Sequence, residues 1–495
     1  MKSNHIHQEA KHAGLSYNTR RHFLRECRTG MGMIALGSLL DSCNFFSSNN
    51  TTELLSNPLA AKPSPLLGKA KAVIFLHMAG APSQLEMFDY KPELQKMDGL
   101  DCPDSFIQGK KFAFIRGVPK LLGPQASFKQ YGESRIWLSN HMPHFQSVVD
   151  EISLLKAVST DQFNHAPAQL LMHCGTPRLG RPSMGSWVTY GLGSENSNLP
   201  GFVVLTSGGR NPDAGKSVWG SGFLPSVYQG VQCRSEGDPV LFLKDPNGFD
   251  RDLRKSSIES INKVNELSYS EYKDPEILSR IAQYEMAFKM QIAVPEVMNI
   301  SDEPAYIHQL YGTKPGKESF ANNVLLARKL VEKGVRFVQL FDWGWDSHGT
   351  DPGTALDQGF IDKCRENDQA VSALLMDLKQ RGMLDETLVV WGGEFGRTPM
   401  QENRDGKQNS FKGRDHHSDA FCMWMAGGGI KKGFTHGETD PIGYNPIDGK
   451  VTVHDIQATI LQQLGFDHTA FTYPFQGRNF RLTDVFGKVI DPIIA

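Results

Sequence analysis

The chain has 495 residues, 39% of them hydrophobic, and a formal net charge of -2. A chain of this length can bury a large core, either as several domains or as one α/β domain with insertions. The near-neutral charge, without a basic stripe interleaved with aromatic residues, argues against nucleic acid as a partner.

The first forty residues have the features of an export signal. Twin arginines in TRRHFLR (19–25) precede GMGMIALGSLL (30–40), a short apolar run without charge. This order is typical of a Tat signal, and the run is shorter than the roughly 20 residues that a membrane-spanning helix needs. The alternative is an ordinary basic terminus. We predict a Tat-type signal over 1–43 and export to the periplasm or the cell surface.

The residues around Cys43 resemble a lipidation site, although Asp41 is atypical there. The predicted contact with a membrane is therefore restricted to a possible lipid anchor at Cys43. The stretch 44–68 contains Ser, Asn and Pro and is predicted to be a linker. The other five cysteines are widely spaced without a CxxC pair, so neither a zinc ribbon nor a disulfide framework is indicated.

From residue 69 onward, apolar runs alternate with helical patterns. Runs that end in glycine and are typical of strands buried on both faces lie at 71–80, 201–209, 335–344, 386–396 and 420–429. Apolar residues at helical spacing predict helices over 276–295, 319–334, 367–383 and 453–465. The sequence thus predicts an α/β fold with a mainly parallel central sheet and helices on both faces. We expect one domain over 69–495, with a helix-rich insertion around 230–316.

Polar side chains follow the first of these strands. Ser83, Glu86 and Asp89 come after it and are candidate metal ligands, with helix-cap and turn roles as the alternatives. Because ligands of such sheets bind beyond the carboxyl ends of the strands, we expect residues from several loops to meet there.

Two later strands also end at candidate ligands. Asp346 and His348 follow the strand at 335–344 on a loop that contains glycine, where they could instead bind backbone amides or solvent. Glu394 directly follows a buried strand, so it needs either a metal or an arginine such as Arg397 to offset its desolvation.

The stretch GRDHHSDAF (413–421) adds Asp415, His416 and His417 before the last strand. On a strand, neighbouring side chains point to opposite faces, so only one of the two imidazoles could enter a given site, whereas on a loop both could. Oxygen and nitrogen ligands without a thiolate suit Zn, Mn, Fe, Mg or Ca. We therefore predict a divalent metal site.

Six segments carry a resemblance to a known family: FLHMAGAPSQLEMFDYKP, NHAPAQLLMHCGTPRLGRPSMGSWVTYGLG, FLPSVYQGVQ, GWDSHG, GEFGRTP and GRDHH. On these segments the chain is identified as a member of the domain-of-unknown-function 1501 family, exported bacterial proteins related to sulfatases within the alkaline phosphatase superfamily. The resemblance spans Lys71 to the C-terminus. It implies an alkaline phosphatase/sulfatase-like fold.

A more distant resemblance to sulfatases implies individual roles. LDETLVVWGGEFG is similar to a strand that ends at a metal-binding acid, which implies Glu394, and AGGGIKKG points to His417. Aligned on its proline, HAPAQLLMHCGTPR has His165 where sulfatases have the Cys or Ser nucleophile, with Ala168 and Gln169 replacing Ser and Arg. A formylglycine mechanism is therefore not supported.

Two functions are consistent with these features. The first is an exported metal-dependent hydrolase of small-molecule or polysaccharide sulfate or phosphate esters. In it His165 would be a further ligand, a general acid/base or, less favoured, the nucleophile. Arg397 or Arg414 would clamp the anion, unless these arginines pair with Glu394 or Asp415 instead.

The second function is a non-catalytic exported metal-containing binding protein for carbohydrate or an anionic polymer, which the altered nucleophile segment favours. An oxidoreductase is disfavoured because no GxGxxG follows a strand.

Overall fold

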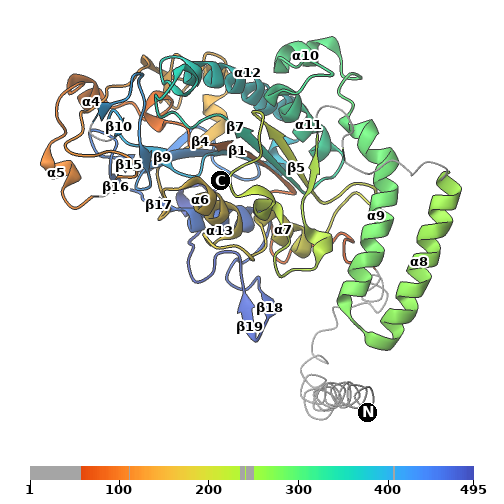
Figure 1. Ribbon diagram of the computed structural model, residues 1–495. Coiled ribbons are helices and arrows are strands. Elements are labelled where there is room, and N and C mark those ends of the chain that lie inside the picture. The colour runs from red at the N-terminus through yellow and green to blue at the C-terminus, as the bar shows by residue number, and fades with distance from the viewer. Residues whose placement is uncertain (1–56, 111, 235–239, 241–249, 405–406) are drawn as a thin grey trace, which may run out of the picture. The chain divides into compact units, whose positions relative to one another are not determined.

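The computed structural model describes residues 57–110, 112–234, 240, 250–404 and 407–495 (Figure 1). The predicted export signal, Cys43 and most of the predicted linker lie outside these residues. Residues Pro58–Ala495 form one compact unit. Within the described ranges, no helix has both the length and the apolar character needed to cross a membrane.

Nine strands in the described part of the chain form the central sheet: β1 (Ala72–Ala79), β4 (Ile152–Ser159), β5 (Phe202–Ser207), β6 (Val231–Cys233), β7 (Phe337–Trp343), β8 (Thr387–Gly392), β13 (Phe421–Ala426), β14 (Phe434–His436) and β17 (Val451–Thr452). Their order is β14-β4-β13-β8-β1-β7-β5-β6, with β17 beside β4. Every neighbouring pair is parallel except those that β13 makes with β4 and β8. The predicted mainly parallel sheet is confirmed.

The central strands are apolar throughout because helices cover both faces. Alternate residues of β1 enter two different core clusters, Ile74 and Leu76 on one face and Val73 and Phe75 on the other. On the first face lie α11 (Phe320–Glu332) and α12 (Gly359–Gln380), and on the second α6 (His165–Cys174), α7 (Met184–Leu192) and α13 (Val453–Gln463) (Figure 1).

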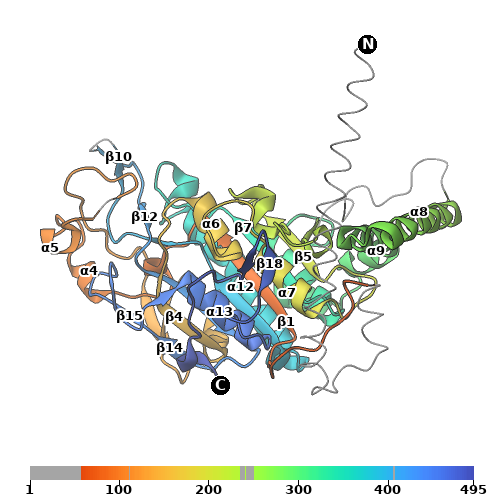
Figure 2. The same ribbon diagram turned by 90° about the horizontal axis from the view of Figure 1, so that it is seen from below.

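The remaining helices lie around this core. They are α4 (Pro92–Lys96), α5 (Asp104–Ile107), α8 (Arg251–Tyr272), α9 (Pro275–Met298) and α10 (Ala305–Tyr311). The helices α8 and α9 run side by side (Figures 1 and 2) and fall in the range of the predicted helix-rich insertion.

Short strand pairs lie outside the central sheet. They are β2 (Phe128–Tyr131) with β3 (Ile136–Ser139), β9 (Gly396–Arg397) with β12 (His416–His417), β10 (Asn403–Arg404) with β11 (Lys407–Gln408), β15 (Glu438–Thr439) with β16 (Pro446–Asp448), and β18 (Tyr473–Phe475) with β19 (Arg478–Phe480). The pair of β9 and β12 matters for function because it carries His416.

The topology gathers several loops at one edge of the sheet. The strands β1, β4, β7 and β8 run in the same direction, so their carboxyl ends share this edge. Since β13 is antiparallel to β8, the residues before β13 arrive at the same edge. The loops that carry Asp346, Glu394 and His416, and the first turn of α6 with His165, therefore lie close together.

Candidate metal centre

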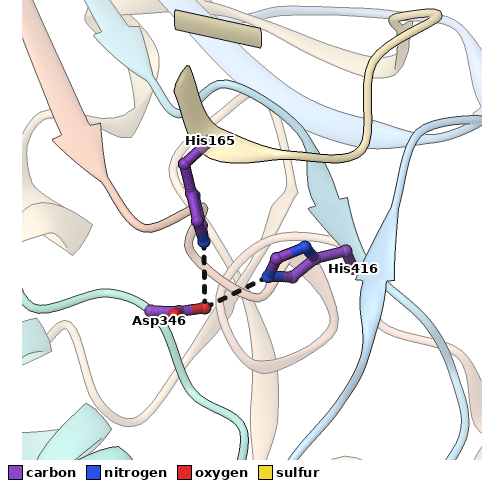
Figure 3. A group of neighbouring side chains, drawn as sticks. All are labelled: His165, Asp346 and His416. Atoms are coloured by element: carbon purple, nitrogen blue, oxygen red, sulfur yellow. Dashed lines mark hydrogen bonds and ion pairs between the residues drawn. The ribbon is translucent and has the colours of Figure 1, made fainter. Parts of the chain in front are cut away.

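Four side chains meet at this edge of the sheet. The Oδ1 atom of Asp346 lies 3.3 Å from Nε2 of His165, 3.3 Å from Nε2 of His416 and 2.9 Å from Nε2 of His348. Figure 3 shows His165, from α6, and His416, from β12, pointing toward Asp346 on the loop after β7. One ligand atom from each of these three residues lies within 4.8 Å of the others, and His348 adjoins them through the shared carboxylate oxygen.

The local backbone makes this meeting possible. Gly80 follows β1 with φ of 111°, and a Cβ atom there would lie 2.5 Å from the backbone nitrogen of Asp346. Only glycine accepts both that dihedral and that approach. On the other side, β12 pairs with β9 so that His416 stands opposite Arg397.

Each imidazole is held through its Nδ1 atom. Nδ1 of His165 lies 2.7 Å from Oε1 of Glu394, and Nδ1 of His416 lies 2.7 Å from the carbonyl oxygen of Phe163. Nδ1 of His348 contacts the carboxylate of Glu402. Acceptors in this position place the proton on Nδ1 and turn the Nε2 lone pair outward, as around the histidine ligands of metals.

His416 shows that a cation fits among these residues. Burial lowers the pKa of His416 to about 4, so its ring carries a single proton at neutral pH. One ring nitrogen faces the Phe163 carbonyl oxygen and the other the carboxylate of Asp346, and both of these are acceptors. Whichever nitrogen holds the proton, the other faces an acceptor. A cation bound at Nε2 removes this conflict.

The other charges in the group also favour a positive ion. Burial would raise the pKa of Asp346, but Arg397 and the three imidazoles hold it far below its usual range. Burial would lower the pKa of His165, but its hydrogen bonds to Asp346 and Glu394 raise it to about 9. Without a metal the group therefore retains a proton, which a divalent ion would displace.

Glu394 is not one of the residues grouped around Asp346 and contacts that group through His165. Its Oε1 accepts from Nδ1 of His165 at 2.7 Å, from the Gly80 backbone N–H at 3.1 Å and from Gln169 Nε2 at 3.1 Å, and its Oε2 lies 3.2 Å from Nε2 of His77. Burial would raise the pKa of Glu394, but His165 and His77 hold it well below its usual range. The structure thus gives Glu394 the role of orienting His165, in place of the direct ligation expected from sequence.

Ser83, Glu86 and Arg414 form a separate buried network. Nη2 of Arg414 lies 2.6 Å from Oε1 of Glu86, and Ser83 Oγ donates to Oε2 of Glu86. Together with carbonyl oxygens of nearby loops, Glu86 accepts all five guanidinium N–H groups of Arg414. Both residues are fully buried. The structure therefore does not support Ser83 and Glu86 as ligands, or Arg414 as a clamp for substrate.

Arg397 is also used within the protein. It is fully buried, contacts Asp346 and donates to the carbonyl oxygens of Gly80, Ala81 and Arg414. Its partner is Asp346, and not Glu394 as considered from the sequence. An arginine held in this way neutralises Asp346 but cannot reach out to grip an anionic ester.

Asp89 also lies apart from the group. Its Oδ1 lies 3.2 Å from Nζ of Lys91 and 3.1 Å from Nζ of Lys156, and its Oδ2 accepts from Thr439 Oγ1. These lysines also bind Glu438. Two ammonium groups and a hydroxyl satisfy Asp89, so the structure gives it a structural role.

Asp415 and His417 flank His416 but turn elsewhere. Asp415 accepts backbone N–H groups of Phe114, Ile115 and His416, at 2.8 to 3.0 Å. Nε2 of His417 lies 2.6 Å from the carbonyl oxygen of Tyr444, on whose ring it stacks. Because β12 is a strand, only one of the two neighbouring imidazoles enters the group, and it is His416.

Comparison with known proteins identifies the family. The family model described as "Protein of unknown function (DUF1501)" matches residues 70–494. The chain belongs to this family. A comparison with curated proteins found no match.

Several solved structures are similar to this DUF1501 protein. The alkaline phosphatase from the Antarctic bacterium TAB5 is 11% identical with a TM-score of 0.32, over 81% of this chain and 99% of that one. The PsFucS1 sulfatase from Pseudoalteromonas sp. is 13% identical with a TM-score of 0.34, over 83% and 74%. The lipoteichoic acid synthase LtaP from Listeria monocytogenes is 11% identical with a TM-score of 0.29, over 90% and 81%.

Two ionisable side chains that the sequence did not assign to the site, Glu402 and His77, contact His348 and Glu394 in this DUF1501 protein. Glu402 follows Arg397 in a loop without strand or helix periodicity, so no local pattern indicated it. His77 interrupts the apolar run of β1, and a polar side chain inside a strand buried on both faces was the available signal.

Proposed function

We propose that the chain is an exported metal-dependent hydrolase of sulfate or phosphate esters. The observation that supports this most directly is His416, whose two ring nitrogens both face acceptors, the Phe163 carbonyl and the Asp346 carboxylate. His165, Asp346 and His416 would hold the ion, and His348 adjoins them. Three protein ligands are typical of catalytic sites because they leave a position for water or substrate.

A divalent ion in such a site polarises an ester oxygen and lowers the pKa of bound water. The protein's own residues supply orientation and access. Glu394 holds His165, and Glu402 holds His348. The side chains of Asp346 and His165 are 22% and 15% exposed, so this is the side of the group nearer to solvent. Arg397 beside Asp346 limits the negative charge that would repel an anionic substrate.

The proposed location is outside the cytoplasm. The twin arginines and the following apolar run support a Tat signal, and a folded export route suits a chain that acquires its metal before leaving the cytoplasm. The proposed substrates are small-molecule or polysaccharide sulfate or phosphate esters. A lipid at Cys43 would keep the protein at the membrane surface.

The test is turnover of 4-nitrophenyl sulfate and 4-nitrophenyl phosphate by the purified protein. We expect hydrolysis that a chelator abolishes and that Zn, Mn, Mg or Ca restores. Asp346→Asn and His416→Ala should lose both metal and activity. His417→Phe, which keeps a ring on Tyr444, should retain both. Activity that survives removal of all metal would contradict the proposal.

A second candidate is a metal-containing protein that binds carbohydrate or an anionic polymer without turning it over. Both arginines expected to clamp an ester, Arg397 and Arg414, are buried and bound within the protein. This observation favours binding over catalysis. Stoichiometric metal in a folded protein that hydrolyses neither ester would select this candidate.

A further inference from the structure

A line of buried polar side chains leads inward from the metal centre. Oε2 of Glu394 lies 3.2 Å from Nε2 of His77, and Nδ1 of His77 lies 3.1 Å from Nε2 of His173. All three side chains are fully buried. The two imidazoles pack against the rings of Phe75 and Phe341, which offer no hydrogen-bonding atoms in their side chains.

The contacts determine where the protons of this line lie. Oε1 of Glu394 already accepts three N–H groups, whereas Oε2 has no hydrogen bond from the described residues and lies 3.2 Å from Nε2 of His77. A buried carboxylate oxygen without a donor costs free energy, so His77 carries a proton on Nε2. With that proton on Nε2, Nδ1 of His77 is the acceptor in its 3.1 Å contact with Nε2 of His173, which donates.

His173 ends the line. Burial lowers the pKa of His173 well below its usual range, so the ring is neutral. With the proton on Nε2, its Nδ1 is a bare lone pair, and no described residue provides a hydrogen bond to it. Among the described residues the line therefore has no outlet for a proton beyond His173. What it can do is fix the orientation of Glu394.

We propose that His77 and His173 are positioning residues that hold Glu394 so that His165 presents Nε2 to the metal. His77 binds Oε2 of Glu394, which leaves Oε1 directed at Nδ1 of His165. His173 in turn keeps the proton of His77 on Nε2. This role rests on the proposed metal centre, although the proton positions of His77 and His173 do not.

The experiment has two readouts. The first is a two-bond ¹H–¹⁵N spectrum of metal-free, ¹⁵N-histidine-labelled protein, in which His77 and His173 should each show a proton on Nε2 alone. The second is zinc affinity, measured by competition with a chromogenic chelator. His77→Phe keeps an aromatic ring but leaves Oε2 of Glu394 without a donor. We expect it to bind zinc about ten- to a hundredfold more weakly, the usual effect of losing a group that orients a ligand.

Matched variants separate positioning from general structure. His77→Gln has an amide N–H at the position of Nε2 and should recover most of the zinc affinity. His173→Phe should have a smaller effect than His77→Phe, because Glu394 still attracts the proton of His77. His417→Phe alters an equally buried histidine outside the line and should bind zinc as the wild type does.

Three results would overturn the inference, each in a distinguishable way. A metal-free spectrum with both nitrogens of His77 protonated would refute the proton arrangement, and it needs no variant to fold. Wild-type zinc affinity in a folded His77→Phe would refute positioning while the metal centre stands. A wild-type protein that binds none of Zn, Mn, Mg or Ca would refute the proposed function and, with it, this role.

Discussion

The contact between Glu402 and His348 gives a sharp test of the metal centre. The Glu402 side chain is fully buried, one oxygen contacts Nδ1 of His348, and the other lies 2.8 Å from Nε of Arg404. Glu402→Gln preserves the shape of the side chain but removes its charge. The imidazole then loses both part of its orientation and the negative partner that strengthens it as a ligand.

The size of the effect follows from the place of His348. Loss of an orienting carboxylate typically costs 10–100-fold in metal affinity, which corresponds to about 1.4–2.8 kcal/mol. His348 adjoins the three-residue group through Asp346 but lies outside it. We therefore expect the lower end, about tenfold weaker zinc binding. Breaking the ion pair between Glu402 and Arg404 should lower the stability of the fold only slightly, because the Arg404 side chain is 43% exposed.

The assay is competition for zinc against a chromogenic chelator at neutral pH, with circular dichroism to confirm folding. Glu438→Gln is the matched control, because it makes the same chemical change in an acid that binds Lys91 and Lys156 instead of an imidazole. Unchanged affinity in Glu402→Gln, or an equal loss in Glu438→Gln, would refute the assignment of His348 to the metal centre.

Three further outcomes are expected. Arg414→Met should lower the free energy of unfolding by about 3–5 kcal/mol in denaturant titrations, because it leaves the Glu86 charge buried without its partner, and a loss below about 1 kcal/mol would contradict this. Burial would raise the pKa of Glu438, but Lys156 and Lys91 hold it below the usual 4.5. The stabilisation from these ion pairs is therefore present above pH 4.5 and is lost on acidification. From pH 6 to pH 3 the melting temperature should fall more steeply in wild type than in Glu438→Gln. Zinc at a hundred times the Kd of the wild-type protein should raise its free energy of unfolding by about 2.7 kcal/mol. An equal rise in Asp346→Asn at the same zinc concentration would contradict the proposed metal site.

The sheet was predictable because its strands carry a local signal. A strand buried on both faces must be apolar throughout, and each predicted run contains an observed strand, such as β1 (Ala72–Ala79) within 71–80. Four strands of the sheet were not predicted: β4 (Ile152–Ser159), whose run ISLLKAVS ends without glycine, and the short strands β6, β14 and β17. Missing β4 in the prediction did not change the predicted site, because the loops after β7 and β8 already placed Asp346 and Glu394 at the ligand-binding edge.

The choice between His416 and His417 shows where the sequence stops being informative. Both were named as candidate ligands, and the resemblance to sulfatases pointed to His417, but the structure brings His416 to the group and turns His417 toward Tyr444. Which one enters depends on how β12 pairs with β9, where His416 stands opposite Arg397 and His417 opposite Gly396. This register is set by contacts between separate segments, and no local pattern in the sequence encodes it.

The acids near the end of β1 were assigned to the metal for a related reason. Glu86 finds its partner in Arg414, 328 residues away, and Asp89 is bound by Lys156 and by Thr439, 350 residues away. A carboxylate beside a glycine turn has the same local signature whether a metal or a distant cation satisfies it. Only the three-dimensional contacts distinguish the two.

The kind of partner then separates structural carboxylates from those of the proposed metal centre. Glu86 and Asp89 are neutralised by arginine and lysine, whose charges are permanent, and such pairs have no need of another ion. Glu394 and Glu402 instead bind imidazoles, which can give up their extra proton. Together with Asp346 these acids bring three negative charges to the site, against one buried guanidinium, Arg397, and the partly exposed Arg404. The net charge of these groups is −2 if solvent fully screens Arg404 and −1 if it does not. A divalent ion would offset this charge once the imidazoles are neutral.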